Sequence, residues 1–151
     1  MFENLKMKFK IAGREIGKNK IPLIIAEIGI NHNGNLDQAI AIADSAIRSG
    51  AEILKHQTHI PDEEMSLEAK KTIPGNSKFS IYKIIKDCAL SEVDEKKLMN
   101  YIKSKKKIFI STPFCKAAVD RLIKFRVPAF KIGSGEWNNL DLIKYICKLK
   151  N

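Results

Sequence analysis

Four short apolar segments, each turning polar at its carboxyl end, constrain the fold of this chain more than any other feature. They read IIAEIGINHNG (24–34), ILKHQTH (53–59), IFISTPF (108–114) and FKIGSGE (130–136). Stretches with helical periodicity follow them along the chain. Strands that alternate with helices in this way predict a parallel sheet with right-handed crossovers. We therefore expect an α/β fold built from four consecutive βα units.

The boundaries of these units follow from the turn residues. The segment 8–17 alternates around an Ala-Gly pair and predicts a short β-hairpin. The four βα units then occupy residues 23–151, a length that suits one domain with its own core. Residues 59–80 contain prolines and a glycine but no clear period, and loops of this size are usually lids or binding loops.

Two lysines lie at the ends of alternate predicted strands, where both can reach one anion. Ligands of parallel α/β folds bind beyond the carboxyl ends of the strands, so Lys55 and Lys131 are expected to converge there. Ammonium groups suit a phosphate or carboxylate, and Thr112 and Ser134 add hydroxyl groups for the same oxygens. The alternative is that the lysines extend past the rim into solvent and that Ser134 only shapes a tight turn.

Four further polar residues at the strand ends are candidates for the same site. Glu27 interrupts an apolar strand, where an unpaired carboxylate is costly, so it either orients a reacting group or pairs with a lysine. Gln57 can bond a ligand or satisfy loop backbone. Glu136 can bind a ligand or cap the helix that follows it. His32 lies in a polar turn, the kind of segment that often carries function.

The remaining titratable residues do not predict a metal site or a disulfide framework. Lys55 and His56 point to opposite sides of one strand, so His56 is interpreted as structural, and the role of His59 stays open. The three cysteines are widely spaced and form no CxxC pattern, which favours reduced thiols.

Charge and hydropathy exclude several classes of protein. The net charge of +10 suits anionic substrates, but the lysines are spread along the chain. KSKKK (103–107) is the one dense cluster and is interpreted as a solvated helix end, so we expect no nucleic-acid binding. Apolar runs reach only strand length, which predicts no membrane span. The basic start has no apolar leader, and we expect a cytoplasmic protein.

Four motifs in register resemble the successive strand-end motifs of the sialic acid synthase family. They are AEIGINHNG (26–34), KHQTH (55–59), FISTPF (109–114) and KIGSGE (131–136), in the family's order and spacing. The resemblance spans nearly the whole chain, and the stretch KHQTHI…EEMS…IPGN is more similar to the sialate and legionaminate branches than to the pseudaminate branch.

This resemblance implies a (β/α)8 barrel of which the chain supplies the first four βα units, preceded by the hairpin. A complete barrel takes roughly 250 residues, so the chain is expected to be the N-terminal half of the catalytic barrel. The C-terminal half-barrel and the family's antifreeze-like domain are expected to be absent. The full-length form is expected to be a homodimer.

The resemblance also implies condensation of phosphoenolpyruvate with an N-acetylmannosamine-like sugar, with release of phosphate. It gives catalytic roles to Glu27, Lys55 and Lys131. Substrate-binding roles fall to Gln57, Thr112, Ser134, Glu136 and His32. A divalent metal is implied, manganese or else magnesium, with its ligands outside this chain.

Two alternatives remain beside this interpretation. The first is a Schiff-base aldolase, in which Lys131 or Lys55 is the nucleophile. The second is a non-catalytic fragment that needs a complementary half, because half a barrel leaves open strand edges that can pair with another chain.

Overall fold

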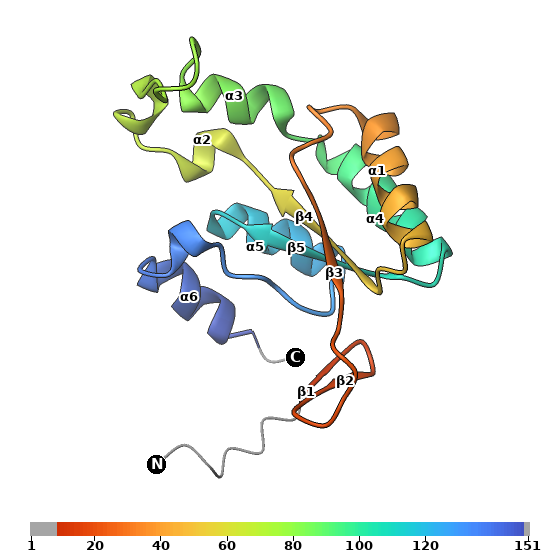
Figure 1. Cartoon of the computed structure of the whole chain (residues 1–151). Helices are drawn as coiled ribbons and strands as arrows, with labels where there is room; N and C mark the ends of the chain where they lie inside the picture. Colours follow the sequence, from red (N-terminus) through yellow and green to blue (C-terminus); the bar gives the residue numbers. More distant parts are fainter. Residues whose placement is uncertain (1–8, 150–151) are drawn as a thin grey trace.

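The computed structural model describes residues 9–149, and its centre is a three-stranded parallel sheet. The strands lie in the order β3-β4-β5 and comprise Ile25–Gly29, Ile53–Thr58 and Ile108–Pro113 (Figure 1). The longer helices are α1 (Leu36–Arg48), α3 (Ile81–Cys88), α4 (Glu92–Ser104), α5 (Lys116–Lys124) and α6 (Leu140–Cys147). The α/β class and the parallel sheet predicted from the alternating pattern are therefore confirmed.

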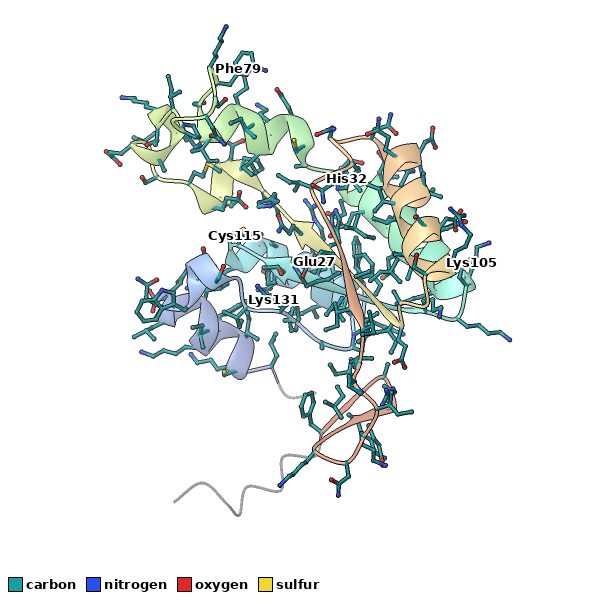
Figure 2. The ribbon with its side chains drawn as sticks, viewed as in Figure 1. Glu27, His32, Phe79, Lys105, Cys115 and Lys131 are labelled. Atoms are coloured by element: carbon teal, nitrogen blue, oxygen red, sulfur yellow. The ribbon has the colours of Figure 1, made fainter. Side chains whose placement is uncertain are left out.

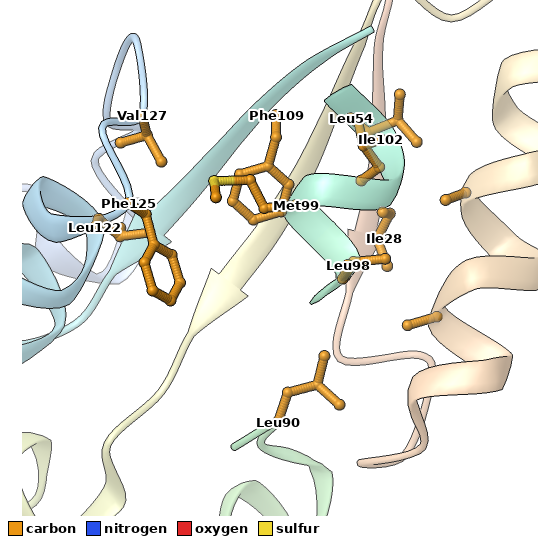
Figure 3. Packing of buried hydrophobic residues seen from close by; sticks show 12 residues of the cluster. Ile28, Leu54, Leu90, Leu98, Met99, Ile102, Phe109, Leu122, Phe125 and Val127 are labelled. Atoms are coloured by element: carbon orange, nitrogen blue, oxygen red, sulfur yellow. The ribbon is translucent and has the colours of Figure 1, made fainter. Parts of the chain in front are cut away.

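One face of the sheet packs against helices and forms the hydrophobic core. Alternate strand residues point to this face, among them Leu54 of β4 and Phe109 of β5, both fully buried. Ala39 and Ala43 of α1 are also fully buried, and their small side chains let this helix lie close to β3 and α4. The cluster, much of which Figure 3 shows, comprises Ile28, Ala39, Ala43, Leu54, Leu90, Leu98, Met99, Ile102, Phe109, Leu122, Phe125 and Val127. Each large side chain in it contributes about 1.5–3 kcal/mol through burial.

Polar side chains define where the helices begin. The Asn35 side chain accepts a hydrogen bond from the Gln38 amide at the start of α1. Ser91 accepts from the Asp94 amide at the start of α4, and its hydroxyl also bonds the Asp94 carboxylate at 3.0 Å. Caps of this kind satisfy amides that the first turn leaves without partners, each contributing about 1 kcal/mol.

The fourth predicted strand does not form as a regular strand. Residues 130–136 make a single parallel bridge between Ser111 and Phe130, and the Lys131 amide donates to the Ser111 carbonyl oxygen at 3.1 Å. The chain then enters a 3-10 turn, η2 (Ser134–Glu136). Two glycines in the segment disfavour extended structure, and within residues 9–149 no strand pairs with its outer edge. The expectation of four regular βα units was wrong in this respect, although α6 follows at the expected place.

The first two strands lie at the amino end of the parallel sheet. β1 (Phe9–Ile11) and β2 (Arg14–Ile16) pair antiparallel (Figure 1). Arg14 donates to Glu52, just before β4, across 2.7 Å, and this ion pair joins the two-stranded unit to the sheet. Residue 8 of the predicted hairpin and the last two residues of the predicted 23–151 unit lie outside the described residues.

The irregular stretch predicted for 59–80 contains two short helical turns. They are α2 (Pro61–Glu64) and η1 (Ala69–Lys71), which precede α3. The Tyr82 hydroxyl and the Lys70 ammonium both donate to the Asp62 carboxylate and thereby join this stretch to α3. Along residues 9–149 no helix combines the length and apolar character that crossing a membrane requires.

Candidate functional site

The face of the sheet opposite the helices carries a buried lysine at its centre. Lys55 of β4 has a side chain that is only 4% exposed. Its ammonium lies 2.8 Å from the Glu27 carboxylate of β3 and donates to the Thr112 hydroxyl of β5 across 3.0 Å. Three adjacent strands thus supply one polar cluster. A buried cation needs partners of this kind, because an unpaired charge in a core is costly.

Strand register explains why these side chains meet. Glu27 and Lys55 are directly paired positions of β3 and β4, and Gln57 is paired with Thr112. Directly paired residues of neighbouring strands point to the same face. The cluster of Glu27, Lys55, Gln57 and Thr112 is therefore a product of the sheet itself and not of a flexible loop.

Glu27 lies on the edge strand and is less enclosed than its sequence context suggests. Its side chain is 58% exposed, although its neighbours in the strand are apolar. Of the two roles considered for this residue, pairing with a lysine is observed, and its carboxylate remains accessible to a ligand. Figure 2 labels Glu27 together with Lys131, which follows the bridge at Phe130.

Lys131 joins the same face through the single bridge beside β5. Phe130 is the partner of Ser111 and packs against the core, so the next residue points to the opposite face, that of Thr112 and Lys55. Gly133 lies beside the same strand, since an added Cβ would be in van der Waals contact with the Thr112 methyl group at 3.4 Å. Lys131 is exposed, and no ion pair of its side chain occurs within residues 9–149.

The loop after Lys131 holds the other two predicted residues. Ser134 is exposed at the start of η2. The Glu136 carboxylate accepts a hydrogen bond of 2.7 Å from the side chain of Asn139, which caps α6. Glu136 therefore supports the cap of the following helix, one of the two roles considered for it, and its second oxygen remains without a contact to Asn139.

Gln57 is held in place by two residues that sequence reasoning did not include in the site. The His59 ring lies 3.1 Å from the Gln57 amide oxygen and 2.9 Å from the Glu64 carboxylate. It also stacks on Phe114 with ring centroids 4.2 Å apart. The acidic run after Pro61 was the one available signal for Glu64. His59, whose role the sequence left open, orients Gln57.

His32 lies away from this cluster. Its side chain is fully buried and its Nε2 atom lies 3.2 Å from Nε2 of His56, which points to the helix side of the sheet. The Gly34 amide donates to Nδ1 of His32, so Nε2 carries the ring proton and donates to His56. Gly34 has a φ of 72° and passes close to the Asp87 carbonyl oxygen, which leaves no room for a Cβ atom. The structure does not bring His32 together with Lys55.

The two histidines belong to a buried polar network between the sheet and its helices. His56 Nδ1 contacts the Glu95 carboxylate of α4 at 3.1 Å, and Thr58 donates to the same oxygen. Arg121 of α5 donates to the other Glu95 oxygen at 3.2 Å. His56 and Glu95 are both about 1% exposed. The interpretation of His56 as structural agrees with this position.

Burial and hydrogen bonding change the pKa values within the network. Desolvation, helped by the neighbouring charge of His56, lowers the pKa of His32 to about 4. Burial alone raises the pKa of Glu95, but the hydrogen bonds from His56, Thr58 and Arg121 outweigh it and leave that pKa below its usual value.

These shifts predict a protein that loses stability in mild acid. A lowered histidine pKa means that the unfolded chain binds a proton between pH 6.5 and about 4 that the folded chain does not. The free energy of unfolding should therefore fall by about 2–3 kcal/mol over that interval. Glu95 acts in the same direction at the acid end, because its stabilisation is lost as pH falls through its lowered pKa.

Urea unfolding at pH 7.0 and pH 4.5 measures this loss. The variant His32→Gln should show a smaller difference between the two pH values, since it lacks the titrating ring. An equal pH dependence in the variant would contradict the assignment to His32.

One cavity near these residues does not include Lys55 or Lys131 in its lining. It has a volume of about 310 Å³ and lies between α2, the start of α5 and the start of α6. Its lining includes the carboxylates of Glu63, Glu64 and Asp141, with Lys116 as its cation. An acidic cavity suits an anion poorly, so the cluster around Lys55 is the better anion site. Within residues 9–149 no three or more histidine, cysteine or acidic side chains are arranged to hold a metal ion.

Comparison with known sequences gives consistent matches to one group of enzymes. The model of the NeuB family matches residues 41–151. The spore coat polysaccharide biosynthesis protein SpsE of Bacillus subtilis is 36% identical over 143 residues, which are 93% of this chain and 38% of SpsE. An N,N'-diacetyllegionaminic acid synthase of Campylobacter jejuni is 36% identical over 135 residues, covering 86% of this chain and 40% of the synthase. The chain thus spans about two fifths of these relatives.

Solved structures agree with the sequence matches. The SpsE crystal structure superposes with a TM-score of 0.70 at 34% identity and covers 93% of this chain and 37% of SpsE. An N-acetylneuraminic acid synthetase of Leptospira borgpetersenii has a TM-score of 0.78 at 23% identity, covering 95% of this chain and 47% of that protein. At that identity the second match speaks for the fold alone, which is the fold that the four motifs predicted.

Proposed function

Because this chain belongs to the NeuB family, we propose that it supplies one wall of a nonulosonic acid synthase site. The reaction proposed is condensation of phosphoenolpyruvate with an N-acyl mannose-type sugar such as N-acetylmannosamine, with release of phosphate. The observation that carries the proposal is the buried Lys55 ammonium, held by Glu27 and Thr112 on the face of the sheet opposite the helices. The relatives named as N,N'-diacetyllegionaminic acid synthase and N-acetylneuraminate-9-phosphate synthase support it.

The two lysines serve in this proposal to bind the anionic groups of phosphoenolpyruvate. Lys55 has a fixed position because Thr112 and Glu27 hold its ammonium, and Lys131 reaches the same face from the neighbouring segment. The C3 carbon of the enol phosphate attacks the sugar aldehyde, water adds at C2, and phosphate leaves with cleavage of the C2–O bond. Preorganised cations stabilise the negative charge throughout without reorganising during the reaction.

The neighbouring residues divide the remaining tasks. Glu27 has an accessible carboxylate and orients the sugar or the water that adds at C2. Thr112 and the exposed Ser134 offer hydroxyl groups to phosphate or carboxylate oxygens. Gln57 presents an amide that His59 holds in one orientation, and Glu136 presents its free oxygen to the sugar. His32 is not part of this arrangement because it is buried on the other face.

A divalent metal, manganese or else magnesium, belongs to the proposal through the family resemblance alone. The described residues provide no set of ligands for such an ion, so no step is assigned to it here. A homodimeric, cytoplasmic full-length form is likewise proposed on the resemblance alone.

Titration of the isotopically labelled chain with phosphoenolpyruvate tests the anion site directly. We expect saturable shifts of the backbone amides at Thr112, Lys131 and Gly133, since the Thr112 hydroxyl binds the Lys55 ammonium, the Lys131 amide bonds the neighbouring Ser111 carbonyl oxygen and Gly133 lies beside the Thr112 methyl group. The variant Lys131→Gln should weaken binding about fivefold, the effect of one partly exposed charge contact. Shifts confined to amides far from Lys55 would contradict an anion site at this position.

Schiff-base chemistry is the second candidate, and one observation bears on it. As an ammonium that contacts Glu27 and donates to Thr112, Lys55 has no free lone pair with which to attack a carbonyl carbon. Lys131 remains available to the aldolase hypothesis. Treatment with pyruvate and borohydride should leave the mass of the chain unchanged, and a reduced adduct on either lysine would favour the aldolase.

A further inference from the structure

A basic cavity lies at the end of the sheet opposite the Lys55 cluster. It has a volume of about 270 Å³, and three cations line it: Lys103, Lys107 and Arg126. Its remaining lining is apolar and comprises Ala12, Ile108, Phe109 and Pro128. Ile108 is the first residue of β5, which places the cavity at the amino ends of the strands. We call this cavity the basic pocket.

The cations of the basic pocket are not neutralised by neighbouring carboxylates. Within residues 9–149 none of the three takes part in an ion pair. Lys103 donates to the Phe125 carbonyl oxygen at 3.4 Å, which holds its ammonium at the end of α5. The Glu52 carboxylate lies near Lys107, but Arg14 already binds it at 2.7 Å. Arg14 is the main cause of the lowered pKa of Glu52, and the charge of Lys107 adds a smaller effect. The pocket therefore keeps its positive charge.

The carboxyl ends of α4 and α5 meet at this pocket, and their dipoles account for only part of its positive charge. The residues just beyond α4 and α5 include Lys106 and Arg126, with φ values of 59° and 54°. Glycine or asparagine is the usual residue in this left-handed conformation. Cations near a helix carboxyl end complement its dipole, which is about half a negative charge for each helix.

The number of cations exceeds what the two dipoles need. Two helix ends amount to about one negative charge, whereas three cations line the pocket: Lys103, Lys107 and Arg126. Figure 2 labels Lys105 at the end of α4. A surplus of positive charge around an open pocket attracts an anion and raises its local concentration.

We propose that the basic pocket binds a small phosphorylated anion. The three lining cations match the two to three negative charges of such a molecule, and the apolar lining suits its non-polar part. A strand of nucleic acid fits less well, because it requires exposed aromatic rings along a groove, and the one aromatic lining residue, Phe109, is fully buried. The pocket goes beyond the proposed function and lies at the other end of the strands from its site.

Titration with pyrophosphate at low salt tests the proposal on the labelled chain. We expect saturable shifts at the amides of Ala12, Lys107 and Arg126, which are far in sequence and meet at the pocket. The double variant Lys103→Gln/Lys107→Gln should weaken binding at these amides at least tenfold, from about fivefold for each charge. Thermal unfolding of the variant checks that its fold is unchanged.

Two control variants separate this pocket from the other anion site. Lys96→Gln removes an exposed lysine of α4 outside the pocket and should leave pyrophosphate binding unchanged. Lys131→Gln weakens the site proposed for phosphoenolpyruvate and should leave the shifts at Ala12 and Arg126 unchanged. The two sites can therefore succeed or fail independently.

Four results would overturn the proposal. Shifts that do not saturate, or that survive the double variant, mean that no pocket is formed. A DNA oligonucleotide and anionic lipid vesicles are titrated against the same amides. If their affinity per phosphate group exceeds that of pyrophosphate, the surface binds a macromolecule instead. Equal binding of sulfate and pyrophosphate means attraction of any anion without recognition.

Discussion

Replacing Lys55 with glutamine is expected to lower phosphate release from phosphoenolpyruvate by about 10²- to 10³-fold, the effect of removing one preorganised donor from a transition state. Lys55 has a constrained position on the face of the sheet opposite the helices, since its ammonium contacts both Glu27 and Thr112. Glutamine keeps a polar group near these partners but removes the charge. The fold should tolerate the change because Glu27 is largely exposed and can be solvated by water.

The assay uses a complementing fragment of a relative, because this chain spans only about two fifths of the relatives' length. Phosphate release is measured with phosphoenolpyruvate, N-acetylmannosamine and manganese. The fragment comes from the Campylobacter jejuni synthase and begins where the match of that synthase to this chain ends. Lys96→Gln is the matched control and should leave the rate unchanged. A Lys55→Gln rate within tenfold of the unsubstituted chain would contradict the role of Lys55. A complemented unsubstituted chain that is inactive with every N-acyl mannose-type sugar would contradict the proposed reaction.

Replacing Glu95 with leucine should lower the free energy of unfolding by about 3–5 kcal/mol. The substitution leaves His56 and Thr58 without their shared acceptor and removes the carboxylate that accepts from the Arg121 guanidinium at 3.2 Å. The Nε atom of Arg121 is already buried without a hydrogen bond among the described residues. Breaking a buried pair is expensive because the remaining charge stays desolvated.

Glu92 provides a control on the same helix. Its carboxylate also faces Arg121, at 3.7 Å, but its side chain is 50% exposed. Glu92→Leu should change the free energy of unfolding by less than about 1 kcal/mol. Urea unfolding at pH 7 measures both variants, and similar losses for the two would contradict a special role for the buried network.

The network around Glu95 shows where sequence reasoning stopped. Glu95 lies in a charged run, EVDEKK, that resembles any solvated helix face. Its spacing to Leu98, Met99 and Ile102 nevertheless places it on the apolar side of α4, and all four are buried. The helical period was therefore an available signal. Its partners could not be found in this way, because they lie on β4 and α5, far away in the chain.

The predicted site residues differ in whether strand alternation determines their position. Glu27, Lys55, Gln57 and Thr112 follow from strand periodicity, since alternation determines which face each residue occupies. His32 had no such constraint in its turn, and the structure places it in the core instead. Lys131 reached the expected face although its strand did not form, because a single bridge at Phe130 is enough to set the alternation.

By itself the sequence determined the α/β class, the order of its units and the four strand-end motifs, because these depend on local periodicity and on residues close in the chain. Only the tertiary structure decided that Lys55 is held between Glu27 and Thr112, that His32 joins a buried network, and that Lys103, Lys107 and Arg126 surround one cavity. The physical reason is the same in each case. Burial and pairing are properties of groups that packing brings together from distant segments, and a local pattern carries no information about such partners.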